Sequence, residues 1–430
     1  MDTQQREDMK TDEPFQMSPI EGGGVTSAAG FTAAGVHAGF RKNPERADLA
    51  LIAAERPVAA AGTFTTNRFC AAPVQVSREH LGGAGKGYGL IRAVVVNSGN
   101  ANAATGAPGL AVAHKTCEVV ARELGCAPEE VLVASTGVIG VPLAIAPFEQ
   151  GVPQAVASLS REGAHAAARA IMTTDTRAKE CAVAYASEAP GYEGARFTVG
   201  GMCKGSGMIM PNMATMIAVI TTDAPVAPRA LHAALASAVR MTFNKVTVDS
   251  DSSTNDTCAM LASGAAAPAA TPIEEGTPAF AELCRAVRAV CETLARAIAA
   301  DGEGASKLVT VTVRGAATDA DADTAARSVA NSPLVKTAIA GRDCNWGRIA
   351  AALGKCGVPF EQERVDIDIM GMPVCRAGLT VPFDEDEALR RFEAPEIVIE
   401  ADLGAGTCST TVWTCDLTHE YVSINADYRS

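Results

Sequence analysis

One run of the sequence has residue types that could break a peptide bond within the chain itself. This run, Lys204–Thr215, reads KGSGMIMPNMAT and ends in the pair Ala214-Thr215. Glycines and small residues allow strained backbone conformations and close approach of other groups. If the peptide between Ala214 and Thr215 were strained, the Thr215 hydroxyl could attack the Ala214 carbonyl. An N-to-O acyl shift and hydrolysis would then release a chain that begins with Thr215.

A threonine at a chain start carries both a nucleophile and a base. Its α-amino group has a pKa near ~8, so it can accept the proton of the hydroxyl on the same residue near neutral pH. The alternative is a threonine that simply opens a strand after a glycine loop, and the residues alone favour this alternative. A phosphate-binding loop is rejected, because the Gly-x-x-x-x-Gly-Lys-Ser/Thr spacing is missing and a strand follows.

A second group of residues could stabilise negative charge on oxygen. Ser135-Thr136-Gly137 stands where a predicted strand, 131–134, gives way to a loop. The Thr136 hydroxyl and a neighbouring backbone N–H could hold the oxyanion of a tetrahedral intermediate, where one lost donor typically costs ~3 kcal/mol. A turn in which Thr and Gly satisfy their own backbone is the alternative reading.

Other polar residues stand at the ends of predicted elements. The run 173–176 (TTDT) follows a helix, and Glu303 lies between two glycines after another helix. The run 249–256 (DSDSSTND) is rich in oxygen ligands but lacks the Gly and closing Glu of an EF-hand, so a hydrogen-bonded polar loop is favoured. Asn425 and Ser430 end a polar tail that would ordinarily be frayed.

The elements that must position these residues mix strands and helices, which indicates α/β or α+β layers. Apolar and β-branched runs predict strands, and helical periodicity with terminal glycines predicts helices. The predicted strands are 49–61, 89–98, 131–134, 195–203, 215–222, 245–250, 307–315, 364–370, 396–402 and 409–415. The predicted helices are 108–124, 154–172, 226–241, 277–300, 325–340 and 346–354.

Composition bounds the class of protein. The 430 residues carry a formal charge of −13, which disfavours nucleic acid and anionic membranes as partners. Thirteen scattered cysteines without a Cys-x-x-Cys pair predict neither zinc nor disulfides, and suggest a reducing compartment. No apolar run reaches the ~20 residues of a membrane span, and the polar start lacks the apolar centre of a signal peptide. We therefore expect a cytoplasmic protein without a metal site.

Together these runs resemble the glutamate N-acetyltransferase / ornithine acetyltransferase family of arginine biosynthesis. The resemblance covers about residue 20 to residue 430, with order and spacing preserved. The matching runs are 99–103 (GNANA), 135–137 (STG), 173–175 (TTD), 204–216 (KGSGMIMPNMATM), 253–256 (STND), 331–338 (NSPLVKTA), 345–348 (NWGR) and the carboxyl end.

This resemblance implies a self-processing, N-terminal-nucleophile-like fold of layered sheets and helices. The precursor would be cut between Ala214 and Thr215 after a solvated tail of residues 1–22, so that an alpha chain, 23–214, and a beta chain, 215–430, share one core. Two such pairs would form a heterotetramer.

Thr215 would carry acetyl from N-acetylornithine to glutamate. The resemblance assigns the oxyanion hole to Thr136 and Gly137. It assigns substrate contacts to Thr173, Lys204, Thr215, Glu303, Asn425 and Ser430. It implies no metal or tightly bound cofactor, and it leaves open acetyl-CoA as a further acetyl donor.

Two positions depart from the family pattern, and two other functions compete. Cys344 stands where a proline usually precedes Asn-Trp-Gly-Arg, and Ala104 stands where a cysteine is common. The first competitor is a related self-processing aminopeptidase or amidase, in which water takes the acyl group. The second is a non-catalytic scaffold, which would have no need of the pair Ala214 and Thr215.

Overall fold

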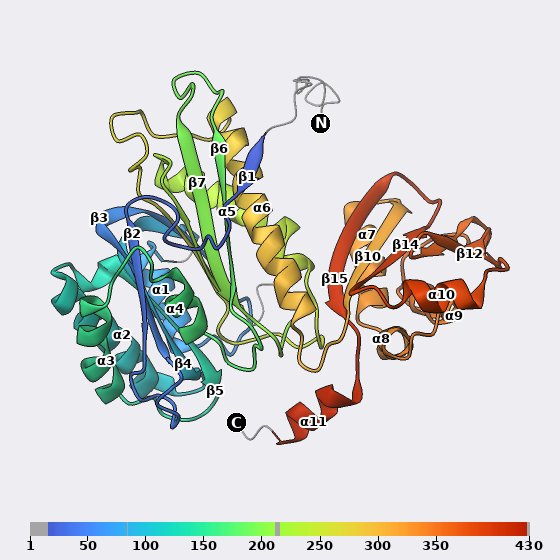
Figure 1. The fold of residues 1–430 in the computed structure, drawn as a ribbon, viewed down its shortest axis with the longest axis horizontal. Coiled ribbons are helices and arrows are strands. Elements are labelled where there is room, and N and C mark those ends of the chain that lie inside the picture. The colour runs from blue at the N-terminus through green and yellow to red at the C-terminus, as the bar shows by residue number, and fades with distance from the viewer. Residues whose placement is uncertain (1–15, 84, 211–215, 428–430) are drawn as a thin grey trace.

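The computed structural model describes residues 16–83, 85–210 and 216–427. Two sheets organise this part of the chain (Figure 1). The larger has nine strands in the order β1-β6-β7-β8-β9-β3-β4-β5, with β2 paired to β3. Its strands are β1 (Met17–Pro19), β2 (Phe31–Val36), β3 (Leu49–Phe64), β4 (Tyr88–Asn100), β5 (Val131–Val138), β6 (Lys179–Ala186), β7 (Arg196–Lys204), β8 (Ile217–Thr222) and β9 (Thr257–Ala262).

The large sheet folds over on itself because β3 is long enough to serve both of its halves. The first part of β3 pairs with β2, its last six residues pair with β9, and β4 runs beside most of it. A register irregularity between Ala53 and Val58 interrupts the pairing with β4. Alternate side chains of a strand point to opposite faces, so each half of the sheet has an inner and an outer apolar face.

The two inner faces form one core. Met202 and Val219 from one half pack in the same buried cluster as Ile52 and Val94 from the other. Each outer face is covered by helices, so the order of layers is helix, sheet, sheet, helix. The covering helices are α5 (Pro228–Met241) and α6 (Pro278–Ala300) on one side, and α1 (Ala72–His80), α2 (Gly106–Leu124) and α3 (Ala146–Ala157) on the other. The predicted α/β fold of layered sheets and helices is confirmed.

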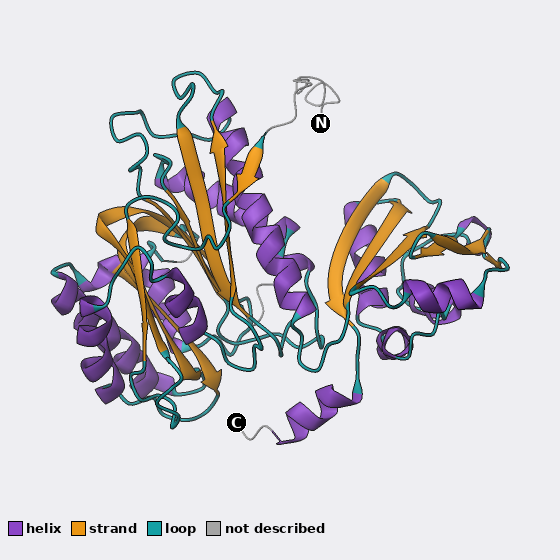
Figure 2. Cartoon of the chain, viewed as in Figure 1, coloured by secondary structure: helices purple, strands orange, loops and turns teal. Residues whose placement is uncertain are grey.

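The second sheet is a separate six-stranded module with its own core (Figures 1 and 2). Its strands, in the order β13-β12-β11-β14-β10-β15, are β10 (Leu308–Ala316), β11 (Asp366–Ile369), β12 (Met372–Arg376), β13 (Leu379–Thr380), β14 (Glu396–Asp402) and β15 (Cys408–Cys415). Its helices are α7 (Asp319–Ala330), α8 (Pro333–Ala340), α9 (Trp346–Gly354) and α10 (Glu385–Arg391). After β15, α11 (His419–Asp427) turns away from this module toward the large sheet.

Local chemistry explains why several elements begin and end where they do. Gly125 ends α2 in a left-handed conformation, with φ of 68°, which costs little without a Cβ. Thr277 caps α6 by accepting a hydrogen bond from the Phe280 N–H, and Pro278 occupies the first turn. The predicted ends of these two helices, at 124 and 300, are confirmed, and their starts lie within two residues of those predicted.

Some predicted elements are wrong. The helix predicted over 154–172 is two helices, α3 and α4 (Ala164–Ala170), because Ser160 between them bridges to Ala33 of β2. The helix over 325–340 is likewise split between α7 and α8, since Pro333 opens a new helix that Ser332 caps. The strand over 245–250 is a 3-10 turn, Phe243–Lys245, and a loop.

Other differences concern strands. The sequence did not predict β2, β6 or β9. Of these, β9 is a fully buried strand of small and apolar residues without alternation. Within the predicted solvated tail, Met17–Pro19 form β1 on the edge of β6. The division into chains 23–214 and 215–430 stays a prediction. Segments from both sides of that division contribute to the large sheet, because β8 and β9 lie between β7 and β3.

A buried serine side chain forms hydrogen bonds with the backbone of Val133 in the edge strand β5. Ser77 Oγ on α1 donates a hydrogen bond to the Val133 carbonyl at 2.7 Å and accepts one from the Val133 N–H at 2.9 Å. Ser77→Ala would leave both groups unpaired, so we expect the free energy of unfolding to fall by ~1–3 kcal/mol. Chemical denaturation measures this. The control is Ser423→Ala on the exposed face of α11, expected to change it by less than ~0.5 kcal/mol.

Candidate functional site

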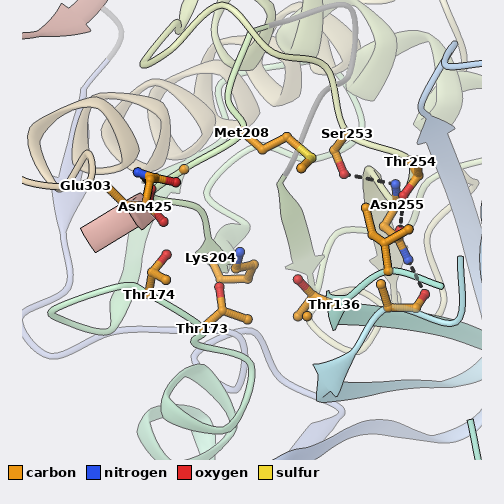
Figure 3. A pocket seen from close by; sticks show the side chains of 14 residues that line it. Thr136, Thr173, Thr174, Lys204, Met208, Ser253, Thr254, Asn255, Glu303 and Asn425 are labelled. Carbon is orange, nitrogen blue, oxygen red and sulfur yellow. Dashed lines mark hydrogen bonds between the residues drawn. The ribbon is translucent and has the colours of Figure 1, made fainter. Parts of the chain in front are cut away.

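A cavity of about 300 Å³ opens where the large sheet, the loop after α6 and α11 meet. Its size is at the lower end of the ~300–1,000 Å³ typical of small-molecule sites. It is lined by Ala101, Thr136, Gly137, Ile139, Thr173, Thr174, Lys204, Gly207, Met208, Ser253, Thr254, Asn255, Glu303 and Asn425. In Figure 3, Glu303 and Asn425 lie on one side, Thr136 and Asn255 on the other, and Lys204 between them.

Six of the residues singled out from the sequence meet in this cavity although they are up to 289 positions apart (425 − 136). They are Thr136, Gly137, Thr173, Lys204, Glu303 and Asn425. The other predicted site residues, Ala214, Thr215 and Ser430, lie outside the described residues. Met216, which follows Thr215 in the sequence, is buried and leads directly into β8.

Thr136 and Gly137 stand at the end of β5, where its backbone runs against β4. Gly137 has φ of +132°, and a Cβ on it would lie 2.4 Å from the carbonyl carbon of Gly99. Only glycine fits this position without moving one of the strands. The close approach places the Thr136 side chain and the Gly137 backbone on the cavity wall.

Lys204 is the cation of the cavity wall, at the end of β7. Its side chain is nearly fully buried, and its Nζ lies 4.0 Å from Asp175 Oδ2. Burial lowers the pKa of Lys204, and the nearby Asp175 carboxylate offsets part of that shift. A partly desolvated ammonium of this kind attracts a carboxylate more strongly than a surface lysine does.

Asp175 is the centre of a buried charge network behind Lys204. Its Oδ1 accepts hydrogen bonds from Lys179 Nζ and the Gly205 N–H, each at 2.7 Å, and its Oδ2 accepts one from the Thr173 N–H at 2.9 Å. Lys179 Nζ also donates to Asp301 Oδ2 at 2.5 Å. Burial alone would raise the pKa of Asp175, but the two lysines and these hydrogen bonds hold it well below its usual range.

The opposite wall carries a carboxylate and an amide. The Glu303 N–H donates to the Ser206 carbonyl at 3.1 Å, and Asn425 Nδ2 of α11 donates to Glu303 Oε2 at 2.9 Å. The Glu303 carboxylate occupies the space beside Gly207, where a Cβ would lie 2.3 Å from it. The carboxyl-terminal segment therefore contributes to the cavity as the resemblance implies, through Asn425.

Several residues that line the cavity were not singled out from the sequence. Two of them are Asn255 and Met208, which belong to runs that matched the family but had no assigned role.

Among the described residues, no group of three or more His, Cys, Asp or Glu side chains is arranged to hold a metal ion. All thirteen cysteines are free thiols. None of the described helices is long and apolar enough to cross a membrane.

Comparison with known proteins decides the family. Residues 32–430 match the ArgJ family. The chain belongs to the ArgJ family. It is 48% identical over 410 residues to the arginine biosynthesis bifunctional protein ArgJ of Symbiobacterium thermophilum, covering 95% of this chain and 99% of that one. It is 47% identical over 407 residues to the protein of the same name from Bradyrhizobium diazoefficiens, covering 94% and 95%.

Solved structures with this family's names are also similar. One is a crystal structure of arginine biosynthesis bifunctional protein ArgJ from Bacillus halodurans, at 41% identity and a TM-score of 0.46, covering 48% of this chain and 97% of that one. Another is ornithine acetyltransferase complexed with ornithine from Mycobacterium tuberculosis. It has 40% identity and a TM-score of 0.40, and it covers 46% and 99%.

The low pKa of Asp175 predicts how the free energy of unfolding depends on pH. A carboxyl whose folded pKa lies below its unfolded value of ~3.9 stabilises the fold above that value, and the contribution is lost as pH falls. Asp175→Asn should therefore lower the free energy of unfolding near pH 7, and the deficit should shrink as pH falls below about 4. Denaturation series at several pH values measure it. Asp402→Asn is the control, since its pair with Arg314 is partly exposed and contributes little to stability.

Proposed function

We propose that this chain transfers acetyl from N-acetylornithine to glutamate through Thr215, after cutting itself between Ala214 and Thr215. The observation that supports this most directly is the gathering in one cavity of four groups from three distant segments: the Thr136 hydroxyl with the adjacent Gly137, the buried cation Lys204 and the carboxylate Glu303. Membership of the ArgJ family supports the reaction, because its curated relatives are named bifunctional proteins of arginine biosynthesis.

In the first half of the reaction, the Thr215 hydroxyl oxygen attacks the acetyl carbonyl carbon of N-acetylornithine. The α-amino group of Thr215 takes the hydroxyl proton and passes it to the leaving nitrogen as the amide C–N bond breaks. Ornithine departs, and the acetyl group stays on the threonine as an ester. The Thr136 hydroxyl and the Gly137 N–H stabilise the oxyanion of the tetrahedral intermediate.

In the second half, the amine of glutamate attacks the ester carbonyl carbon. The bond from that carbon to the Thr215 oxygen breaks, the proton returns to the threonine, and N-acetylglutamate leaves. Both halves use one site, so each amino acid must fit the same charged walls. Lys204 suits a substrate carboxylate, and Glu303 suits an ammonium. Thr173, Asn425 and Ser430 complete the proposed substrate contacts.

The assembly and the cellular setting are part of the same proposal. The alpha chain, 23–214, and the beta chain, 215–430, remain folded together, and two such pairs form a heterotetramer. No metal or tightly bound cofactor takes part, and acetyl-CoA serves as a second acetyl donor to glutamate. Free thiols at all thirteen cysteines are compatible with a reducing compartment such as the cytoplasm.

The nucleophile is tested by replacing it. Thr215→Ala removes the hydroxyl, so the protein should stay a single chain of about 44 kDa and transfer no acetyl group. Denaturing electrophoresis, intact mass and the amino-terminal sequence of the fragments measure the cut. Thr215→Ser keeps a hydroxyl and should still be cut. A Thr215→Ala protein that still divides at this bond would refute the assignment.

The same purified enzyme distinguishes transfer from hydrolysis. Ornithine release from N-acetylornithine should depend on glutamate, with N-acetylglutamate formed in equal amount. Steady production of free acetate without glutamate would instead identify an amidase.

Thr136 is tested separately from the nucleophile. Thr136→Ala should lower kcat roughly 100- to 1,000-fold, because one donor to the oxyanion is lost at the step where charge develops. The fold should be retained, which circular dichroism and denaturation check. Thr312→Ala, on β10 of the six-stranded module, is the control and should leave kcat unchanged. An unaltered rate in Thr136→Ala would remove this residue from the oxyanion hole.

A further inference from the structure

Asn255 lies in the turn that leads into β9, on the cavity wall near Thr136 (Figure 3). Its side chain is only 6% exposed, so its carboxamide must find partners within the protein. It comes from the second half of the sequence, whereas the oxyanion donors come from the first. A contact between them joins two segments that share no loop.

The carboxamide of Asn255 binds two carbonyls at once. Its Nδ2 donates to the Ala101 carbonyl oxygen at 2.6 Å and to the Ser135 carbonyl oxygen at 2.9 Å. Its Oδ1 accepts from Thr254 Oγ1 at 2.5 Å, which fixes which way the amide faces. The Ser135 carbonyl belongs to the same peptide group as the Thr136 N–H, so this bond fixes the peptide plane that orients Thr136.

The regular strand pairing ends just beyond this position. Ser135, Thr136 and Gly137 of β5 pair in register with β4, and the ladder becomes irregular one residue later, at Asn100, which faces both Thr136 and Val138. Gly137, in the last regular pair, has a positive φ, and Ala101 lies beyond the end of β4. Backbone that departs from a regular ladder persists only where the surroundings hold it. The Asn255 carboxamide joins Ala101, beyond the regular ladder, to Ser135 within it, and so spans the point where the pairing becomes irregular.

The next residue in the turn acts on the other reacting segment. Asp256 is fully buried, and its Oδ1 accepts a hydrogen bond at 2.8 Å from the Met216 N–H. That N–H is bonded to the carbonyl carbon of Thr215. Two adjacent residues of one turn therefore bind the strand end that carries the oxyanion donors and the strand that follows the proposed nucleophile.

We infer that Asn255 is a positioning residue of the reaction, which holds the peptide that orients the oxyanion donors Thr136 and Gly137. The inference rests on the proposed acetyl transfer. Asn255 acts through the peptide group that it binds. Its replacement should therefore lower the rate of the chemical step and leave substrate affinity unchanged. A displacement of about 1 Å in such a group can cost about 100-fold in rate.

Asn255→Asp tests this with almost no change of shape. The carboxylate replaces the Nδ2 donor with an oxygen that faces two carbonyl oxygens, so it repels the peptide that the amide held. We expect kcat for glutamate-dependent ornithine release to fall about 100-fold, with KM for N-acetylornithine within about threefold of wild type. The measurement uses the cut protein, purified and checked for full processing.

The matched control is Asn102→Asp. Asn102 is also fully buried, its Nδ2 donates to a backbone carbonyl, that of Gly109, and its Oδ1 accepts from a threonine hydroxyl, that of Thr105. It does not line the cavity, so its variant should lose stability without losing kcat. A milder variant is Thr254→Val, which frees the Asn255 amide to rotate and should lower kcat about 5- to 10-fold at unchanged KM.

The outcomes separate this inference from the proposed function. If Thr136→Ala keeps full activity, the oxyanion hole is misassigned and both ideas fail. If Thr136→Ala is impaired while Asn255→Asp and Thr254→Val keep kcat within threefold of the Asn102→Asp control, only the role of Asn255 fails. A fall in activity that lies wholly in KM would also overturn it. If Asn255→Asp does not fold, the kcat of Thr254→Val decides.

Discussion

The cavity depends on one buried carboxylate. Asp175 accepts hydrogen bonds from the backbone of two segments, at Thr173 and at Gly205, while Lys179 neutralises it and Lys204 lies 4.0 Å away. A charge removed from water is tolerated only when it is paired and fully hydrogen-bonded. Satisfying all these partners at once restrains the loops that carry them. The network therefore fixes where the cation of the site stands.

Lys179 extends this constraint to the opposite wall. It also binds Asp301, the residue that ends α6, and Ser206 Oγ donates to the Asp301 carbonyl at 2.7 Å. Two residues further on, Glu303 receives Asn425 from α11. Cation and carboxylate are thus held apart across the cavity by one continuous set of contacts. In the proposed reaction these two charges would face the carboxylate and the ammonium of the amino-acid substrate.

The sequence predicted the long, periodic or strongly capped elements of this fold. It located α2, α6, β4 and β10, because alternation, helical spacing and terminal glycines are local signals. It failed where distant contacts override local preference. The break between α3 and α4 depends on a bridge from Ser160 to a strand more than 120 residues earlier in the chain, and β9 has no alternation because both of its faces are buried.

The candidate site shows the same division. The sequence resemblance named six residues that the structure brings into one cavity, and no periodicity could have done so. The sequence did not reveal the hydrogen bonds from neighbouring residues that hold these six residues in place. Asn255 is recognisable as a functional residue only once its amide is seen to bind carbonyls of two other segments, since an asparagine in a polar turn is unremarkable by itself.

Because β8 lies between two other strands of the large sheet, a cut before residue 215 would change how the protein unfolds. β8 pairs with β7 along Ile217–Thr222 on one side and with β9 on the other, so the fragments would stay associated through the interior of a sheet. Denaturation would then yield two separate polypeptides, and re-forming the sheet would become a second-order encounter. The midpoint of thermal melting would rise with protein concentration, as it does for an obligate complex.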